Sequence, residues 1–376
     1  GEEDMGNKST LINFLKWVDE YYQAEKHKIL QFSNHGGGPR SALDISQRRG
    51  LCWDFTSDEK DPFLKTKDVS EAFAEAGYGK DKQFDMLIFD VCLGASIEDS
   101  YQFKDYAKYL LGSANTVPGS GLDYTKILDN ISETATIPEI GIGIIDYYKK
   151  FYTTNPYWSQ RWDNEIAYWQ KYVTEHKLNL NPVDIAAFHR PDACTFSLID
   201  LLQVQAVADA VNDLADFILK NAESLNSYKI NIGTELNPKT VPILRTYFDC
   251  YFYLNEPVYQ GTFTWLHDIG YMAENIATFC NNYQLMNTGL MTKANTLKNA
   301  LQTAITYTWR EGPDTDDSLY LGKNLPYGMT IAGATYASDG TDGYAPNFYK
   351  KELAFGEKTS WGDLLALYFG TDPDNI

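Results

Sequence analysis

Residues 84–95 read FDMLIFDVCLGA, a hydrophobic strand that ends in Asp90 and is followed two positions later by Cys92. Because α/β proteins bind ligands at the carboxyl edge of their sheet, a thiol at this position is a candidate nucleophile. Residues 28–38 read KILQFSNHGGG, another apolar strand, which runs into His35 and then three glycines that permit close backbone approach. Two strands therefore present a histidine and a cysteine.

A histidine next to a cysteine gives a recognised chemistry. The imidazole lowers the pKa of the thiol, and it later protonates a leaving amine. The backbone N–H groups of Gly36 and Cys92 are placed to stabilise the negative charge of a tetrahedral intermediate. Taken singly, each residue also has a structural interpretation, since a strand-end cysteine is commonly a small core residue and a histidine beside glycines a loop residue.

Several segments together resemble the clostripain family of cysteine peptidases. They are residues 1–6 (GEEDMG), His35-Gly36, residues 90–93 (DVCL), 96–98 (SIE), 109–113 (YLLGS), 118–124 (PGSGLDY), 194–201 (CTFSLIDL) and 344–361. The 57 positions from His35 to Cys92 (92 − 35) are close to the spacing of about 50 in caspases, although the caspase signature around the cysteine is absent. The resemblance is strongest around these two residues and weakest over 130–190 and 225–340. It implies a caspase-like α/β fold, mostly a parallel sheet with helices on both faces.

The resemblance also implies roles for residues. It predicts a cysteine endopeptidase that cleaves after Arg or Lys, with His35, Cys92 and Gly36 catalytic. In the family, the acid matching Asp90 lies at the base of the primary specificity pocket; the alternative is an acid that caps the following helix. Ser120 and Asp123 are further substrate-binding candidates. The turn at 118–122 lacks the acid and tryptophan often found there, and Asp123 is a candidate substitute for the acid. Nearby, Gly94 stands where the family commonly has methionine.

Relatives cut their own chain between the histidine and the cysteine. Arg48 and Arg49, which precede Gly50 in a loop-like stretch, are the first candidates for such a cut. The predicted reaction requires no cofactor. Four acids in the same region are candidate calcium ligands: Asp54, Asp58, Asp61 and Asp68. They lack EF-hand spacing, and the alternative interpretation is a solvated acidic surface. Glu98 is interpreted as a structural partner on the helix after the cysteine.

Composition limits the partners. The chain has 376 residues and a net charge of −19, which argues against nucleic acid and is compatible with basic peptide or protein substrates. Five cysteines without close pairing do not favour a disulfide framework. No apolar run reaches the roughly 18 residues that span a bilayer. No signal peptide is present at Gly1. Because family members carry a strand upstream of this start, we expect a secreted, periplasmic or cell-surface protein whose leader lies outside this sequence.

Periodicity and turn residues predict the order of elements. The predicted elements are helices at 8–22, 66–76, 96–106, near 124 and 197–222, strands at 29–33, 84–90 and 108–113, a loop at 36–67 with a short strand near 51–53, mainly helices over 225–310, and strands and turns over 319–355. We expect a catalytic core at 1–135, with the family's N-terminal strand either included or lying outside this sequence, and an α+β region at 136–376 packed on it.

Two other functions use the same residues. A catalytically silent surface or binding protein would keep the fold without a working pocket. A thiol acyltransferase or amidase would use the same histidine and cysteine, and only substrate tests distinguish it from a peptidase.

Overall fold

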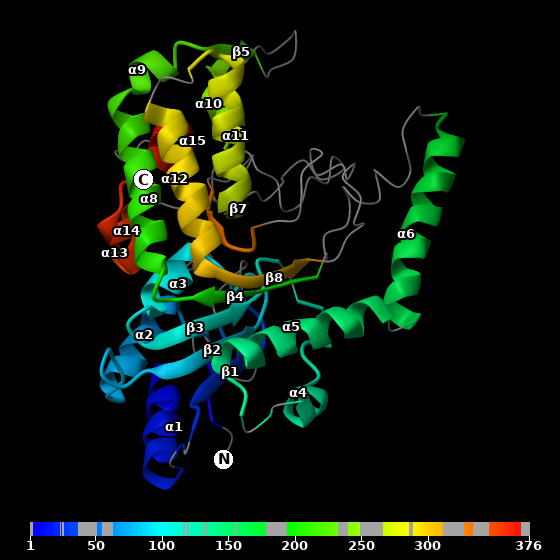
Figure 1. Ribbon diagram of the computed structural model, residues 1–376, viewed down its shortest axis with the longest axis vertical. Helices are drawn as coiled ribbons and strands as arrows, with labels where there is room; N and C mark the ends of the chain where they lie inside the picture. The colour runs from blue at the N-terminus through cyan, green and yellow to red at the C-terminus, as the bar shows by residue number, and fades with distance from the viewer. Residues whose placement is uncertain are drawn as a thin grey trace.

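The centre of the molecule is a five-stranded sheet with strand order β1-β2-β3-β4-β8 (Figure 1). The computed structural model describes residues 3–22, 24, 26–36, 51–54, 63–115, 117–118, 120–130, 132, 134–154, 156–177, 194–231, 240–248, 266–285, 289–310, 327–333 and 346–369. The strands of the sheet are β1 (Ile29–Ser33), β2 (Phe84–Asp90), β3 (Ala107–Gly112), β4 (Thr195–Asp200) and β8 (Ile305–Arg310). β1, β2 and β3 pair in parallel, and β4 pairs antiparallel with both of its neighbours. Four strands of this sheet thus share one direction, as the predicted mostly parallel fold requires.

The sequence of β2 explains its central place. Successive side chains of a strand point to opposite faces. Leu87 and Phe89 belong to one buried cluster, whereas Met86 and Ile88 belong to a second cluster on the other face. A strand covered on both faces reads as a continuous apolar run, which is why its predicted bounds are confirmed.

On one face of the sheet, the larger buried cluster joins side chains of the strands to those of several helices. These are α1 (Lys8–Tyr21), α2 (Thr66–Glu75), α3 (Ile97–Phe103), α8 (Val204–Lys220), α11 (Ile269–Asn282) and α12 (Gly289–Ala304). In α8, Val204, Val207, Val211 and Leu214 are fully buried at spacings of three and four, the stripe expected of a helix with one core-facing side. Figure 1 shows α8, α11 and α12 with α15 (Trp361–Phe369) as a bundle beside the sheet.

The other face is covered chiefly by α5 (Ile137–Thr154), with α4 (Tyr124–Asn130) next to it. The ring of Tyr148 lies 4.8 Å from that of Phe196 on β4 and 5.9 Å from that of Trp309 on β8. α6 (Pro156–Glu175) follows α5 and extends away from the sheet (Figure 1). Among the described helices, none is long and apolar enough to cross a membrane.

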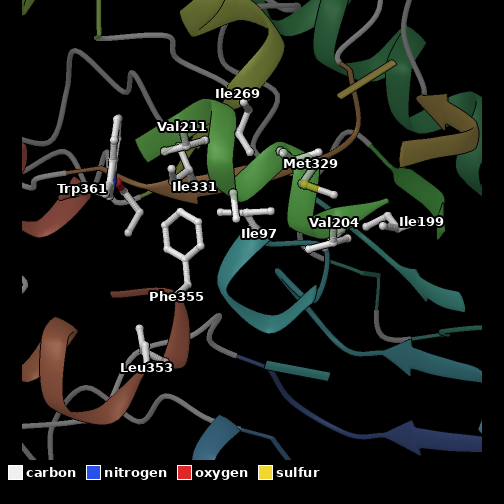
Figure 2. Close-up of a cluster of buried hydrophobic side chains, with 14 of the residues drawn as sticks. Ile97, Ile199, Val204, Val211, Ile269, Met329, Ile331, Leu353, Phe355 and Trp361 are labelled. Carbon is white, nitrogen blue, oxygen red and sulfur yellow. The ribbon is translucent and has the colours of Figure 1, made fainter. Parts of the chain in front are cut away.

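Residues near the C-terminus complete the larger core. Phe355 and Trp361 are fully buried, and Figure 2 shows them packed with Ile97, Val211 and Ile331. The indole Nε1 of Trp361 donates to the carbonyl of Ala332 at 2.7 Å. The remaining elements are short: α9 (Ala222–Leu225), β5 (Lys229–Asn231), β6 (Thr240–Pro242), α10 (Ile243–Thr246), β7 (Leu266–Asp268), β9 (Thr330–Ala332), α13 (Pro346–Glu352) and α14 (Ala354–Lys358).

Two sequence predictions are wrong about the outer strands. The predicted helix at 197–222 begins at Val204, because residues 195–200 form β4. Residues 305–310, in a stretch predicted to be mainly helical, form β8. Both strands are fixed by pairing with distant segments, which outweighs local propensity. The sheet therefore draws strands from both sides of residue 135, and the predicted division at that residue stays a prediction.

Candidate active site

A pocket at the carboxyl ends of β1 and β2 brings most of the predicted site residues together. Its volume is about 420 Å³. The lining residues are Ser33, Asn34, His35, Asp90, Cys92, Val117, Pro118, Ser120, Gly121 and Tyr124. The parallel register of β1 and β2 pairs Ser33 with Asp90, so the residues that follow each strand meet at one edge.

Gly36 makes the closest approach between the histidine and cysteine segments. A Cβ atom built at Gly36 would lie 2.4 Å from the carbonyl oxygen of Cys92 and 2.7 Å from the Cβ of Val91. Those distances are too short for any side chain, so this position requires glycine. The Gly36 N–H also acts on the Cys92 sulfur, where it lowers the pKa of the thiol.

The turn after β2 sets the direction of Cys92. Leu93 has a φ of 61°, a left-handed conformation that costs a non-glycine residue about 1–3 kcal/mol. The Leu93 N–H donates to the carbonyl of Asn115 at 2.9 Å, which holds the turn. Gly94 follows, and a Cβ atom there would lie 2.8 Å from the Cβ of Phe89, so the methionine expected at this position has no room without a shift.

The surroundings of Cys92 favour the neutral thiol over the thiolate. Burial raises the pKa of the thiol, and the nearby Asp90 charge adds to the rise; N–H groups of Val117, Cys92 and Gly36 oppose it. The Val117 N–H donates to Sγ at 3.3 Å, and Sγ donates to the Val117 carbonyl at 3.8 Å. A thiolate nucleophile therefore requires a base, and the exposed His35 lines the same pocket.

Asp90 lines the pocket and has 5% of its surface exposed. Its Oδ2 accepts hydrogen bonds from the Leu122 N–H at 3.1 Å, from the Tyr124 hydroxyl and from the Ser33 hydroxyl at 3.5 Å. Its Oδ1 is buried and accepts no hydrogen bond from the described residues. Gly121 has a φ of +55°, and a Cβ there would lie 2.8 Å from Oδ2, so glycine lets the turn wrap around the acid.

Asp123 and Glu98, two other acids considered in the sequence, are not among the pocket-lining residues. Asp90 does not cap α3, because Ser96 accepts the Asp99 N–H at the start of that helix. Asp123 is outside the set of pocket-lining residues; its carboxylate accepts the Lys126 N–H at 3.2 Å in the first turn of α4. Glu98 is fully buried in the core.

The predicted autoprocessing and calcium sites fall largely outside the described residues. Arg48, Arg49, Asp58 and Asp61 all lie there. In the part of the chain that the structure describes, no group of three His, Cys, Asp or Glu side chains is arranged to hold a metal ion. Calcium binding therefore stays a prediction.

Sequence reasoning missed two pocket residues that contact Asp90. Tyr124 is the last residue of the PGSGLDY segment, which was the available signal. Ser33 ends β1 directly opposite Asp90, and only the strand register reveals that neighbour. The remaining cysteines that the structure describes, Cys52, Cys194 and Cys280, are buried and form no disulfides.

The fold and pocket define an α/β protein that presents a thiol and an imidazole at the carboxyl edge of a mostly parallel sheet. The sequence profile of the clostripain family matches residues 1–366. This chain therefore belongs to the clostripain family.

Individual relatives match less completely. Clostripain from Hathewaya histolytica is 31% identical over 138 residues, which are 35% of this chain and 25% of that protein. A secreted cysteine protease from Bacteroides thetaiotaomicron, solved with an irreversible peptide inhibitor, has a TM-score of 0.54 at 14% identity over 95% of this chain and 78% of that one. An inactive protease zymogen from Parabacteroides distasonis has a TM-score of 0.51 at 16% identity, covering 94% of this chain and 75% of that one. At these identities the two solved structures support the fold.

Proposed function

We propose that this protein is a cysteine endopeptidase that hydrolyses peptide bonds after Arg or Lys. The observation that carries the proposal is that Cys92, His35 and Asp90 line one pocket. A nucleophile, a base and an acid that recognises a basic side chain are the three groups that this reaction needs. Membership of the clostripain family supports the same reaction.

The proposed reaction uses the chain's own residues in sequence. His35 accepts the Cys92 proton, and the thiolate attacks the substrate carbonyl carbon. The N–H groups of Gly36 and Cys92, which act on the sulfur in the resting state, stabilise the oxyanion that forms next to it. His35 then protonates the leaving amine, and water hydrolyses the thioester. In enzymes where one oxyanion donor has been removed, the loss is about 3 kcal/mol.

Asp90 would select the basic side chain. A carboxylate that lines a pocket is attractive to a guanidinium or ammonium group, and the net charge of −19 steers basic peptides toward the protein. Ser120 lines the same pocket. Opposite charge and enclosure favour Arg and Lys over neutral side chains.

We also infer that the protein cuts itself between His35 and Cys92. The two candidate arginines lie in sequence between Gly36, which follows His35, and Leu51, and these two residues pair with each other. Arg48 and Arg49 supply the basic residues that the proposed selectivity requires on the amino side of the cut bond. A secreted or cell-surface location is part of this proposal, supported by the likeness to a secreted protease.

Active-site labelling tests the proposed reaction. The protein is incubated with acyloxymethyl ketones that carry Lys, Arg or Leu next to the ketone, and the adduct is located by mass spectrometry. We expect the basic reagents to modify Cys92, and Cys92→Ala to abolish the adduct. Cys280→Ala is the matched control, because this buried cysteine is outside the pocket. Labelling that survives in Cys92→Ala contradicts the peptidase, and a wild-type protein that reacts with none of the reagents favours the silent binding protein.

Self-cutting has its own test. The intact chain is incubated alone, and its fragments are identified by mass beside those of Cys92→Ala and the double variant Arg48→Ala/Arg49→Ala. We expect a cut in the wild type that both variants lose. A wild-type enzyme that stays one chain at full activity shows that no self-processing is needed.

A further inference from the structure

The Tyr124 hydroxyl has no role in the proposed reaction, although it lies against the acid that would select the substrate. Tyr124 is the first residue of α4, lines the pocket and is 38% exposed. Its hydroxyl is hydrogen-bonded to Asp90 Oδ2 and lies 3.1 Å from Ser33 Oγ. The side-chain amide of Gln31 donates to the same hydroxyl oxygen. The hydroxyl therefore has one donor and two acceptors around it.

A phenol carries one proton, so the hydroxyl donates either to Asp90 or to Ser33 at any moment. While the pocket is empty, the Asp90 carboxylate is the stronger acceptor, because hydrogen bonds to an ionised group are about twice as strong as neutral ones. Oδ2 then accepts the Tyr124 hydroxyl, the Leu122 N–H and, at 3.5 Å, the Ser33 hydroxyl, and Oδ1 is buried. In the resting arrangement, the Tyr124 hydroxyl therefore occupies a lone pair of Asp90 Oδ2 that an incoming cation needs.

We propose that Tyr124 is a specificity-determining residue that binds the substrate's Arg or Lys side chain together with Asp90. When the cation enters, the Tyr124 hydroxyl rotates about its C–O bond and donates to Ser33 instead. One lone pair of Asp90 Oδ2 and one of the Tyr124 oxygen then accept N–H groups of the cation. No covalent bond is made or broken, and the proton stays on Tyr124. This inference rests on the proposed function, because it concerns the same pocket.

Ser33 is essential to this exchange because it supplies the second acceptor. Its Oγ is close enough to take the proton, and its place at the end of β1 is fixed by pairing with Asp90 across the parallel strands. Two rival roles for Tyr124 give different outcomes. A tyrosine that only blocks the pocket would give tighter substrate binding when its hydroxyl is removed, and a tyrosine that only supports the fold would change stability without changing recognition.

The test compares Tyr124→Phe, Ser33→Ala and the double variant. kcat and KM are measured with matched peptides that carry Lys, Arg or Leu before the scissile bond, and iodoacetamide alkylation of Cys92 reports on the integrity of the site. Tyr307→Phe is the matched control, since the exposed Tyr307 hydroxyl donates to Asp146 at 2.7 Å on the far strand β8.

We expect KM for the basic peptides to rise about tenfold in each single variant, the size expected from one hydrogen bond to a charged group, with kcat within about twofold of wild type. The double variant should be no worse than Tyr124→Phe, because both changes remove the same exchange. Alkylation of Cys92 and the Tyr307→Phe kinetics should be unchanged.

An unchanged or lower KM in Tyr124→Phe overturns the inference, and so do additive effects in the double variant. Thermal unfolding is recorded for each variant; if Tyr124→Phe does not fold, Ser33→Ala alone decides, and an unchanged KM in that variant overturns the inference. A wild-type protein that cleaves the Leu and Lys peptides equally refutes the selectivity of Asp90 and this inference with it. A wild-type preference for basic peptides that both single variants retain in full refutes only the role of Tyr124.

Discussion

Asp90 and Glu98 are eight positions apart in the chain (98 − 90), and both are buried, yet they belong to different parts of the molecule. Asp90 lines a pocket, and hydroxyl and amide groups at the pocket wall contact one of its oxygens. Glu98 lies in the core, where Oε1 accepts the Ala332 N–H at 2.8 Å and the Tyr349 hydroxyl at 2.7 Å. Burial alone therefore does not distinguish the two acids, whereas contact with a pocket does.

The pKa shifts point to the same distinction. Burial raises the pKa of Glu98 to about 7, that of Asp99 to about 6 and that of Asp268 to about 7. Asp268 accepts the Tyr271 N–H at the start of α11, and Asp99 accepts the hydroxyl groups of Thr66 and Ser96. Perturbed pKa values are often used to find active sites, but structural networks perturb them as well. In this protein the strongly shifted carboxyl groups hold helices in place.

The largest expected effect separates the two acids by activity. Asp90→Asn should lower kcat/KM for Lys and Arg peptides by about 10³-fold, because the substrate cation is left in the pocket without an anion. Glu98→Gln should leave kcat/KM within about threefold of wild type. Steady-state kinetics with both variants check this. Equal losses of kcat/KM in the two variants would show that the pocket acid and the core acid do not differ in function.

The second prediction concerns the contribution of Glu98 to the pH dependence of the free energy of unfolding. An acid whose pKa is higher in the folded state binds its proton more tightly there, so the free energy of unfolding falls as the pH rises from about 4 to about 7. The rise in the Glu98 pKa from 4.5 to about 7 accounts for about 3 kcal/mol of this loss. Urea titrations between pH 4 and pH 8 measure the slope. Glu98→Gln should reduce the slope, and a slope that Glu98→Gln leaves intact contradicts this origin.

A smaller change tests the hydrogen bond to Glu98. Tyr349→Phe removes a donor from a buried carboxylate and should cost about 2 kcal/mol of unfolding free energy at pH 8. At pH 5, where Glu98 is protonated, the cost should be smaller. Chemical denaturation at the two pH values compares them, and an equal cost at both would show that the charge on Glu98 is not involved.

The smallest effect concerns Asp123, which the sequence placed beside the substrate. Since its carboxylate accepts the Lys126 N–H at the start of α4, Asp123→Ala should cost about 1 kcal/mol of stability. The ratio of kcat/KM between Lys and Leu peptides should not change. A loss of basic selectivity as large as that of Asp90→Asn would return Asp123 to the substrate site.

Local sequence was sufficient for β1 and β2, at one side of the sheet. β1 and β2 are apolar runs that end at polar residues, so their bounds agree with the predicted ones. β4 and β8 were not recognised because each adjoins a helix with little to separate them; β8 begins at Ile305 directly after α12 ends at Ala304, with no glycine or proline between. Their strand identity comes from pairing with segments far away in the chain.

The candidate site likewise contains residues that the sequence predicts and residues that only the tertiary structure reveals. His35, Asp90, Cys92 and Ser120 line one pocket because they follow strands or occupy a turn that sequence patterns reveal. Ser33 and Tyr124 were missed because their hydroxyl groups reach Asp90 through tertiary placement. Asp123 is not among the pocket-lining residues, whereas its neighbour Tyr124, the first residue of α4, is.

The antiparallel pairing of β4 with β8 also has a consequence for how the chain assembles. Ser197 and Thr308 contact each other across 111 positions, so the outer strand joins the sheet only after a long loop has closed. Contacts of such high sequence separation slow folding. Until β8 arrives, β4 presents an open row of backbone donors and acceptors, which is a template for pairing with another molecule. A truncation before Ile305 should therefore form aggregates through β4, and refolding yield should fall as protein concentration rises.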